Sequence, residues 1–322
     1  MTFLIQIRTK IRHFNITREE WVVRLLRFAI VLAVLLVMNR CFGYQKILNH
    51  WWVSVVIAGI SMLLPLAGST FIVFFVGLMH LMTLSTDAAV IALVLLAISY
   101  AVSAYFRSDD TYNMMVIPAC RYLNIPFVVP MEAGLMRSIH ELPTIICGSV
   151  LSYYLKTVVE NASSFLDPNT DLSAAELLQG QILNNSMFYI YLVAMTAMFL
   201  VVYTVRTKGI EHAWLVGVLS GVVVVLMLAG ILFTGEKENI PLLVIGNVVT
   251  LIVGLGMVFF ARGFDYTRTE HVQFEDDEYY YYVTAVPKMH IPEQEKEIKR
   301  ITSETLPLPV DDLEETEETQ DN

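Results

Sequence analysis

The chain contains a series of apolar segments that are long enough to cross a lipid bilayer. Between Trp21 and Phe260 the sequence consists mostly of Leu, Val, Ile, Ala, Phe and Met, interrupted by short polar turns. Hydrophobic residues make up 56% of the chain, against about 45–50% in an ordinary soluble domain. Because a helix needs about 20 apolar residues to span the hydrocarbon core, this pattern predicts an integral membrane protein with many spans.

The apolar segments predict an all-α, polytopic membrane helix bundle of about eight spans. We expect residues 1–20 to form a basic interfacial segment on the membrane surface and residues 21–262 to form the membrane domain. The predicted spans cover residues 21–38, 50–67, 69–85, 87–105, 142–157, 187–205, 213–233 and 240–261.

Small residues recur every four positions in the last two predicted spans. They are Ala213, Gly217 and Gly221 in one span and Gly246, Thr250 and Gly254 in the other. Such stripes let helix backbones approach closely in lipid, so they predict packing seams.

The positions of the basic residues predict the orientation of the spans, because cytoplasmic loops carry an excess of Lys and Arg. An arrangement of eight spans with both termini in the cytoplasm puts most of the basic residues that flank spans on the cytoplasmic side. The same arrangement puts the acidic loop 158–186 on the outer side. Arg40 and Lys46 are exceptions, since they fall on the outer side. The residues predicted to be cytoplasmic are Arg8, Lys10, Arg12, Arg18, Arg107, Arg206, Lys208, Arg262 and Arg268.

The segment 112–137 is apolar in part, but a full crossing there would reverse every later loop. Pro118, Pro126 and Pro130 remove backbone donors and interrupt helices within 13 residues. Interrupted backbone at membrane depth is tolerated only where protein or a water-filled cavity satisfies its polar groups. The pattern therefore predicts a broken or re-entrant segment, with a surface loop or an amphipathic surface helix as the alternative.

The same segment and the residues just after it concentrate the charged side chains that could carry chemistry. Glu132 has apolar neighbours on both sides, and a carboxylate in hydrocarbon is costly unless it is paired or hydrated. Three interpretations stay open: a substrate or ion site, a structural ion pair with Arg121 or Arg137, and exposure to lipid headgroups. The candidate site residues are Glu132, Arg121, Arg137 and His140.

No motif of known chemistry occurs in the chain, so an enzyme is not the expected class. The sequence lacks a nucleotide-binding loop, a nucleophile elbow and a complete zinc-protease motif, and its three cysteines are far apart. No metal site and no cofactor are expected. An intramembrane acid–base enzyme built from Glu132 and His140 stays as an alternative, whereas His80 is expected to be a hydrogen-bonded packing residue.

After Arg262 the composition changes abruptly to an acidic tail, residues 263–322. Residues 264–322 carry 17 acidic and 5 basic side chains, so nucleic acid is not an expected partner. The strand formers at 279–286 predict a strand that pairs with a partner protein, folds onto the membrane domain or stays disordered. The candidate partner-binding residues are Phe274, Tyr279, Tyr280, Tyr281, Tyr282 and Val283.

Three stretches resemble an uncharacterised group of multi-pass membrane proteins from clostridial bacteria. They are Phe-Glu-Asp-Asp-Glu-Tyr-Tyr-Tyr-Tyr-Val-Thr-Ala-Val-Pro-Lys at 274–288, Ile-Pro-Phe-Val-Val-Pro at 125–130 and Leu-Ser-Tyr-Tyr-Leu at 151–155. The resemblance implies a bacterial cytoplasmic membrane, and it carries no site residues over to this chain.

Two functional classes follow from these patterns. The favoured hypothesis is a non-enzymatic scaffold or assembly component of the cell envelope, whose tail recruits a cytoplasmic protein. The alternative is a transporter or permease subunit in which the segment 112–137 lines the path and Glu132 meets the substrate. In both cases the protein is expected in the cell membrane, in contact with the lipid bilayer and with room for further membrane subunits.

Overall fold

The computed structural model describes residues 18–108, 111–166, 173–208, 212–232, 240–261, 270–275 and 280–285. The chain divides into two units, one up to Gly263 and one from Phe264 onward. The predicted interfacial segment lies almost entirely outside the described residues, and so do Tyr279 and the tail beyond Ala285.

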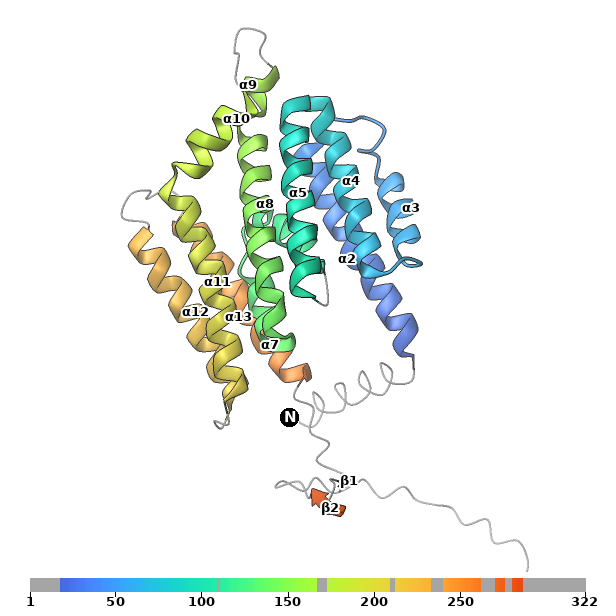
Figure 1. Ribbon diagram of the computed structural model, residues 1–322, viewed down its shortest axis with the longest axis vertical. Coiled ribbons are helices and arrows are strands. Elements are labelled where there is room, and N and C mark those ends of the chain that lie inside the picture. Colours follow the sequence, from blue (N-terminus) through green and yellow to red (C-terminus); the bar gives the residue numbers. More distant parts are fainter. Residues whose placement is uncertain are drawn as a thin grey trace, which may run out of the picture. The chain divides into compact units, whose positions relative to one another are not determined.

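The first unit is all-α in the part that the structure describes (Figure 1). A 3₁₀ turn at Ile139–Glu141 leads into α8, and a π-helical turn at Leu178–Leu183 follows α10. The helices are α2 (Glu19–Phe42), α3 (Trp51–Ser61), α4 (Leu66–Leu84), α5 (Thr86–Phe106), α6 (Tyr112–Tyr122), α7 (Val128–Met136), α8 (Leu142–Glu160), α9 (Ala162–Leu166), α10 (Ala174–Leu177), α11 (Ser186–Thr207), α12 (Ala213–Leu232) and α13 (Ile240–Ala261).

Six segments of the described chain are long and apolar enough to cross a membrane, namely α2, α4, α5, α8 with its preceding turn, α11 and α13. Two shorter apolar helices accompany them, α3 and the stretch Ala213–Leu228 within α12. Many large apolar side chains on these helices are exposed, as expected for surfaces that face lipid. The prediction of an all-α, multi-pass membrane protein is confirmed at this level.

The second predicted span, residues 50–67, is shorter in the structure. Its helix α3 ends at Ser61, and a new helix begins after Pro65. Proline lacks a backbone N–H and disfavours helical geometry in the residue before it, so it separates the two helices. The Arg27 guanidinium of α2 donates a hydrogen bond to the Leu64 carbonyl in this turn, which anchors the turn beside α2.

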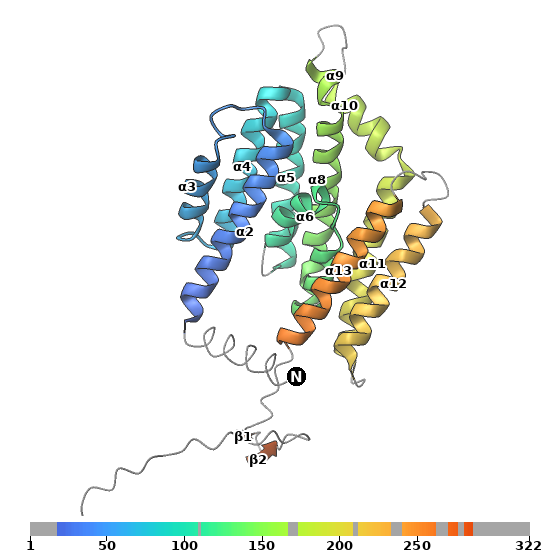
Figure 2. The same ribbon diagram turned by 180° about the vertical axis from the view of Figure 1, so that it is seen from behind.

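Helices α2 and α4 run in the same direction with the short α3 between them, and the long helices from α4 to α13 alternate in direction (Figures 1 and 2). The start of α2 lies at the same end of the bundle as the end of α13. Two hydrophobic cores hold the bundle together. One core joins α2, α3, α4, α5, α6, α8 and α10 with Phe188 at the start of α11, and the other joins α7, α11 and α12 with Ile117 and Ile145. Since α6, α8 and α11 contribute to both cores, they connect the two halves.

Helices α6 and α7 form a hairpin inside the bundle instead of crossing it (Figure 2). With 11 and 9 residues they are about 16 and 14 Å long, which is about half of the 30 Å hydrocarbon core. The hairpin turns at residues 123–127, where Asn124 adopts a left-handed conformation (φ 60°). The chain therefore enters the bundle through α6 and returns through α7, as a re-entrant segment does.

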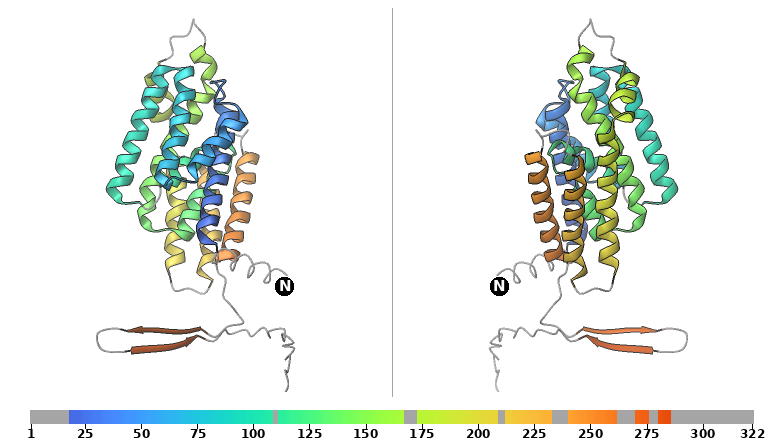
Figure 3. Two further views of the ribbon diagram at one scale, coloured as in Figure 1. Left: turned by 90° about the vertical axis from the view of Figure 1, so that its right-hand side faces the viewer. Right: turned by 90° about the vertical axis from the view of Figure 1, so that its left-hand side faces the viewer.

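In the second unit the strand β1 (Glu270–Glu275) pairs with β2 (Tyr280–Ala285) in an antiparallel hairpin (Figure 3). Phe274 lies opposite Tyr281 in this register. The strand predicted within 279–286 is present as β2, and the neighbouring segment Glu270–Glu275 supplies its hydrogen-bonding partner. The strand pattern at 279–286 did not by itself predict this pairing within the tail.

Candidate functional site

The base of the α6–α7 hairpin contains a buried carboxylate. Glu141, at the end of the 3₁₀ turn, is 0% exposed, and its Oε2 accepts hydrogen bonds from Asn113 Nδ2 (2.8 Å) and Thr144 Oγ1 (2.9 Å). Because a carboxylate can only accept, Asn113 must present its NH₂ group to Glu141. The Oδ1 atom of Asn113 is then buried without a hydrogen-bond partner among the described residues.

Glu132 and Arg137 form an ion pair within α7 and its C-terminal end. Arg137 Nε lies 3.6 Å from Glu132 Oε1, and each side chain keeps about a fifth of its surface exposed. The Arg137 guanidinium also lies over the ring of Tyr112, 5.4 Å from its centre. Glu132 Oε2 is buried without a hydrogen-bond partner in the described part of the chain, so the carboxylate is only half satisfied.

Arg206, near the end of α11, caps the C-terminal end of α7. Its Nη1 donates to the Leu135 carbonyl (2.6 Å) and its Nη2 donates to the Arg137 carbonyl (3.0 Å). A helix C-terminus presents carbonyls without intrahelical partners and a partial negative charge, so a cation is favoured there. This contact fixes the returning arm of the hairpin to α11.

A second cation lies near the tip of the hairpin. Arg121, in the last turn of α6, is covered by two tyrosine rings: its guanidinium carbon lies 4.5 Å from the ring centre of Tyr153 and 3.9 Å from that of Tyr191. The two rings come from α8 and α11. Tyr153 accepts a hydrogen bond from Asn185 (3.3 Å), and Tyr191 shares one with Ser152 (3.2 Å), so polar contacts orient both rings.

Glycines on the hairpin itself and on two neighbouring helices let the hairpin pack closely. A Cβ at Gly148 of α8 would lie 3.1 Å from the Asn113 carbonyl oxygen, and one at Gly134 of α7 would lie 2.9 Å from Val202. A side chain at Gly246 of α13 would collide with the carbonyl of Asn124 at the tip. The predicted small-residue seam of the last span therefore faces the hairpin at Gly246, within the same chain.

The structure brings only some of the predicted site residues together. Glu132 pairs with Arg137, whereas Arg121 lies between two tyrosines and His140 is exposed. Sequence reasoning did not assign roles to Asn113, Tyr153 and Tyr191 or to the carboxylate of Glu141. The His140–Glu141 pair was visible in the sequence, but burial of Glu141 depends on α6 covering the start of α8.

His80 belongs to a separate buried network in the first core. Its Nδ1 accepts from the backbone N–H of Gln45 (3.3 Å), so its Nε2 carries the proton and donates to Asn39 Oδ1 (3.1 Å). The Asn39 amide in turn donates to the Leu48 carbonyl and to Ser54 (both 2.9 Å). Each ring nitrogen thus has a partner, which fits a packing role.

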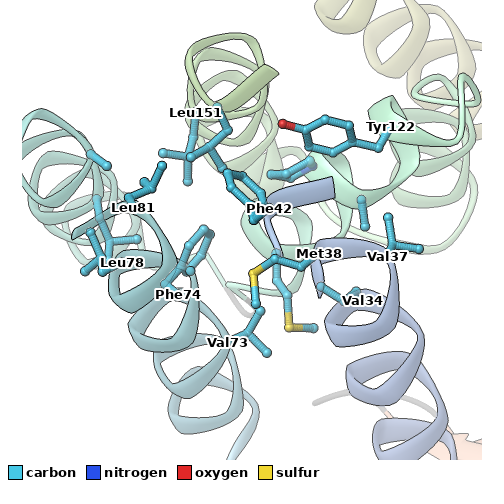
Figure 4. Close-up of a pocket in the computed structure, with 17 residues that line it drawn as sticks. Val34, Val37, Met38, Phe42, Val73, Phe74, Leu78, Leu81, Tyr122 and Leu151 are labelled. Carbon is cyan, nitrogen blue, oxygen red and sulfur yellow. The ribbon is translucent and has the colours of Figure 1, made fainter. Parts of the chain in front are cut away.

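An apolar pocket lies beside the ascending arm of the hairpin (Figure 4). Side chains of α2 and α4 face each other across it. Tyr122 is the one lining residue with a polar side-chain atom. The lining suits hydrocarbon, and its labelled members are Val34, Val37, Met38, Phe42, Val73, Phe74, Leu78, Leu81, Tyr122 and Leu151.

Within the described ranges no group of three or more His, Cys, Asp or Glu side chains could hold a metal ion. Comparison with known proteins gives no family. No protein-family model matches the chain, and neither a curated protein nor a solved structure matches it. The fold and the site define an integral membrane protein with many helical spans, and the resemblance to the clostridial group receives no support beyond that class.

Proposed function

We propose that the protein is a membrane transporter or permease subunit, in which the re-entrant hairpin α6–α7 lines the path of a polar solute. The observation that carries the proposal is the unsatisfied polar surface on this hairpin: Asn113 Oδ1, Glu132 Oε2 and Ser138 Oγ are buried without partners among the described residues. Buried polar atoms in lipid-embedded proteins are expected to meet partners, water or a ligand.

The helix arrangement supports the same proposal. Helices α2 and α4 run in the same direction, so the segment between them, which contains the 11-residue α3, returns across the bundle (Figure 1). With this segment and α12 added to the six long segments, the chain makes eight crossings, and the start of α2 and the end of α13 lie on one side. Arg107, Arg206 and Lys208 follow helices that end on that side, so the positive-inside rule makes it the cytoplasmic side. In this orientation the hairpin opens its base, with Glu132 and Glu141, toward the cytoplasm.

The proposal is tested by the water accessibility of position 132. Cys41, Cys120 and Cys147 are replaced by Ala, and Glu132→Cys is then added to that background. Membrane-impermeant, charged thiol reagents are applied to oriented vesicles from each side. Labelling at a rate close to that of His140→Cys, an exposed position on the same side, is the expected outcome.

The matched negative control is Ile252→Cys, because Ile252 is 63% exposed on the apolar α13 and faces lipid under this arrangement. Complete protection of position 132 from both sides would place Glu132 in a dry structural pair. Such protection would remove the main support for a solute path.

The second candidate function is the envelope scaffold, and the tail hairpin favours it. An isolated two-stranded hairpin is at best marginally stable in water, and both of its outer edges can accept a further strand. The hairpin β1–β2 therefore gains stability if a cytoplasmic protein adds a strand to it. Phe274, Tyr280, Tyr281, Tyr282 and Val283 lie in its paired strands.

One experiment separates the two functions. A strain that lacks the gene is complemented with a chain lacking residues 272–292 or with Glu132→Gln. If the protein transports a solute, Glu132→Gln fails to complement, and the tail deletion has only a small effect on complementation. The reverse order is expected if the protein is a scaffold.

A further inference from the structure

The guanidinium of Arg121 lies well inside the length of the spans. Tyr191 is five residues beyond the first residue of α11, and Tyr153 is seven residues before the last residue of α8, which are about 7.5 and 10 Å along each helix axis. Arginine stays protonated in proteins, and a charge at such depth is costly without compensating partners. The surroundings of this cation therefore require an explanation.

The two tyrosine rings compensate only part of this cost. Both ring centres lie within 4.5 Å of the guanidinium carbon but only 6.0 Å from each other, so the rings do not lie on opposite faces of the guanidinium; each cation–π contact contributes about 0.5–2 kcal/mol. The end of α6 adds a partial negative charge. Neither contribution supplies an oxygen acceptor for the N–H groups, which point outward in the guanidinium plane.

No acceptor for those N–H groups exists in the part of the chain that the structure describes. Arg121 Nε is buried without a hydrogen-bond partner, and no described carboxylate forms an ion pair with this residue. Arg137 and Arg206, in contrast, each have an oxygen partner within 4 Å. Arg121 is thus a stacked cation whose hydrogen-bonding edge is unused.

We infer that Arg121, which lies against the rings of Tyr153 and Tyr191, binds an anionic oxygen group of a ligand, a carboxylate or a phosphate. The planar fork of a guanidinium matches two oxygens of either group, and charge-assisted bonds of this kind are about twice as strong as neutral ones. The two rings restrict the position of the guanidinium before the ligand arrives, which lowers the entropic cost of binding.

The role of this anion as the transported solute rests on the proposed function, whereas its binding at Arg121 does not. The ligand can be a free solute or a lipid headgroup, because both present the same oxygens. A binding measurement separates the two proposals: a protein that binds phosphate through Arg121 and moves no solute keeps this inference and loses the transport function.

The test uses the full-length protein in nanodiscs of phosphatidylcholine. The unfolding temperature is recorded against increasing sodium phosphate or sodium acetate, with sodium chloride at equal ionic strength as the reference for screening. A third series replaces part of the lipid with phosphatidylglycerol. A ligand that binds only the folded state raises the unfolding temperature as its site fills.

For the wild-type chain we expect a saturable rise with at least one of these probes, and for Arg121→Gln we expect none. A response to phosphate or acetate identifies a free solute, and a response to phosphatidylglycerol alone identifies a headgroup. The matched control is Arg24→Gln, because Arg24 also lies over an aromatic ring, that of Trp21, on the outer surface of α2. This control should respond as the wild type does.

Arg121→Lys keeps the test informative if Arg121→Gln does not fold. Lysine retains the charge and loses the planar fork, so the probe concentration for half-maximal response should rise about tenfold. The inference is overturned if no probe gives a rise that depends on Arg121. It is also overturned if Arg121→Lys responds at the same concentration as the wild type.

Discussion

The base and the tip of the α6–α7 hairpin stabilise their charges by different means. At the base, each charged side chain has a polar partner: Glu141 accepts from Asn113, Glu132 pairs with Arg137, and Arg206 binds two carbonyls, although Asn113 Oδ1 and Glu132 Oε2 keep no described partner. At the tip, Arg121 contacts two aromatic rings and no described oxygen. The difference shows that one short helical hairpin combines an anchor made of hydrogen bonds and ion pairs with a cation that is held in place but not neutralised.

This contrast indicates that the base of the hairpin contributes mainly to stability and the tip mainly to ligand binding. Hydrogen-bonded pairs at the base resist movement, because breaking one leaves a buried polar group unsatisfied. The stacked cation at the tip can gain a ligand without losing a protein partner. Variants at the base should therefore reduce stability most, whereas variants at the tip should have smaller effects on stability and larger effects on ligand binding.

The largest loss is expected from Glu141→Ala at the base. The variant removes the buried acceptor of Asn113 and leaves that amide with Thr144 Oγ1 alone, while Thr144 keeps its bond to the carbonyl of residue 141; together with the cavity left by the side chain this should lower the free energy of unfolding by about 3 kcal/mol. Denaturant titration in mixed micelles measures the change. Glu160→Ala at the other end of α8 is the control, because its exposed pair with Lys156 should contribute less than about 1 kcal/mol. Equal losses in both variants would contradict the anchor at the base.

Gly246→Leu tests how tightly the tip is held. The new side chain collides with the Asn124 carbonyl, so we expect the free energy of unfolding to fall by about 2.5 kcal/mol through overpacking. Gly256→Leu on the same helix is the control, since a Cβ there meets no atom within 4 Å. A tip that tolerates Gly246→Leu as well as the control would mean that residues 123–127 are not fixed against α13.

Arg206→Gln removes the cap on α7. Loss of two bonds from a charged donor to the carbonyls of Leu135 and Arg137 should lower the free energy of unfolding by about 2 kcal/mol. The same titration measures it, with the exposed Lys208→Gln as the control for loss of charge. If Lys208→Gln is equally destabilising, the effect is one of net charge and not of capping.

The smallest effect on stability is expected from Tyr191→Leu at the tip. Loss of one aromatic face should lower the free energy of unfolding by about 1 kcal/mol. Tyr191→Phe keeps the ring and loses only the hydroxyl contact with Ser152, so it should be milder. A larger loss for Tyr191→Phe would assign the stabilisation to the hydroxyl and weaken the contrast between the two ends.

The sequence was sufficient for the spans, because a bilayer imposes a length and an apolar composition on any helix that crosses it. Helix α13 has the same bounds as its predicted span, 240–261, and α12 differs by one residue. The span predicted at 50–67 was too long, because Pro65 and the turn before it separate α3 from α4. The segment 112–137 is interrupted at residues 123–127, which include Pro126, whereas Pro118 lies inside α6 and Pro130 lies in the first turn of α7 and neither ends a helix.

The sequence could not supply the partners of the charged residues. Arg121 and Arg137 were equal candidates for Glu132, and only the turn at 123–127 decided that Arg137 lies beside it. The rings around Arg121 are 32 and 70 residues away, beyond the reach of any local pattern.

By itself the sequence determined the solvent of this protein, the approximate number and length of its spans, the interrupted segment and the acidic tail, because each follows from local composition or spacing. Tertiary structure alone decided that Glu141 is buried, that Arg121 is stacked between α8 and α11, and that β2 pairs with β1. The physical reason is that burial, ion pairing and strand pairing depend on which distant segments meet, and those encounters are set by the packing of the whole chain.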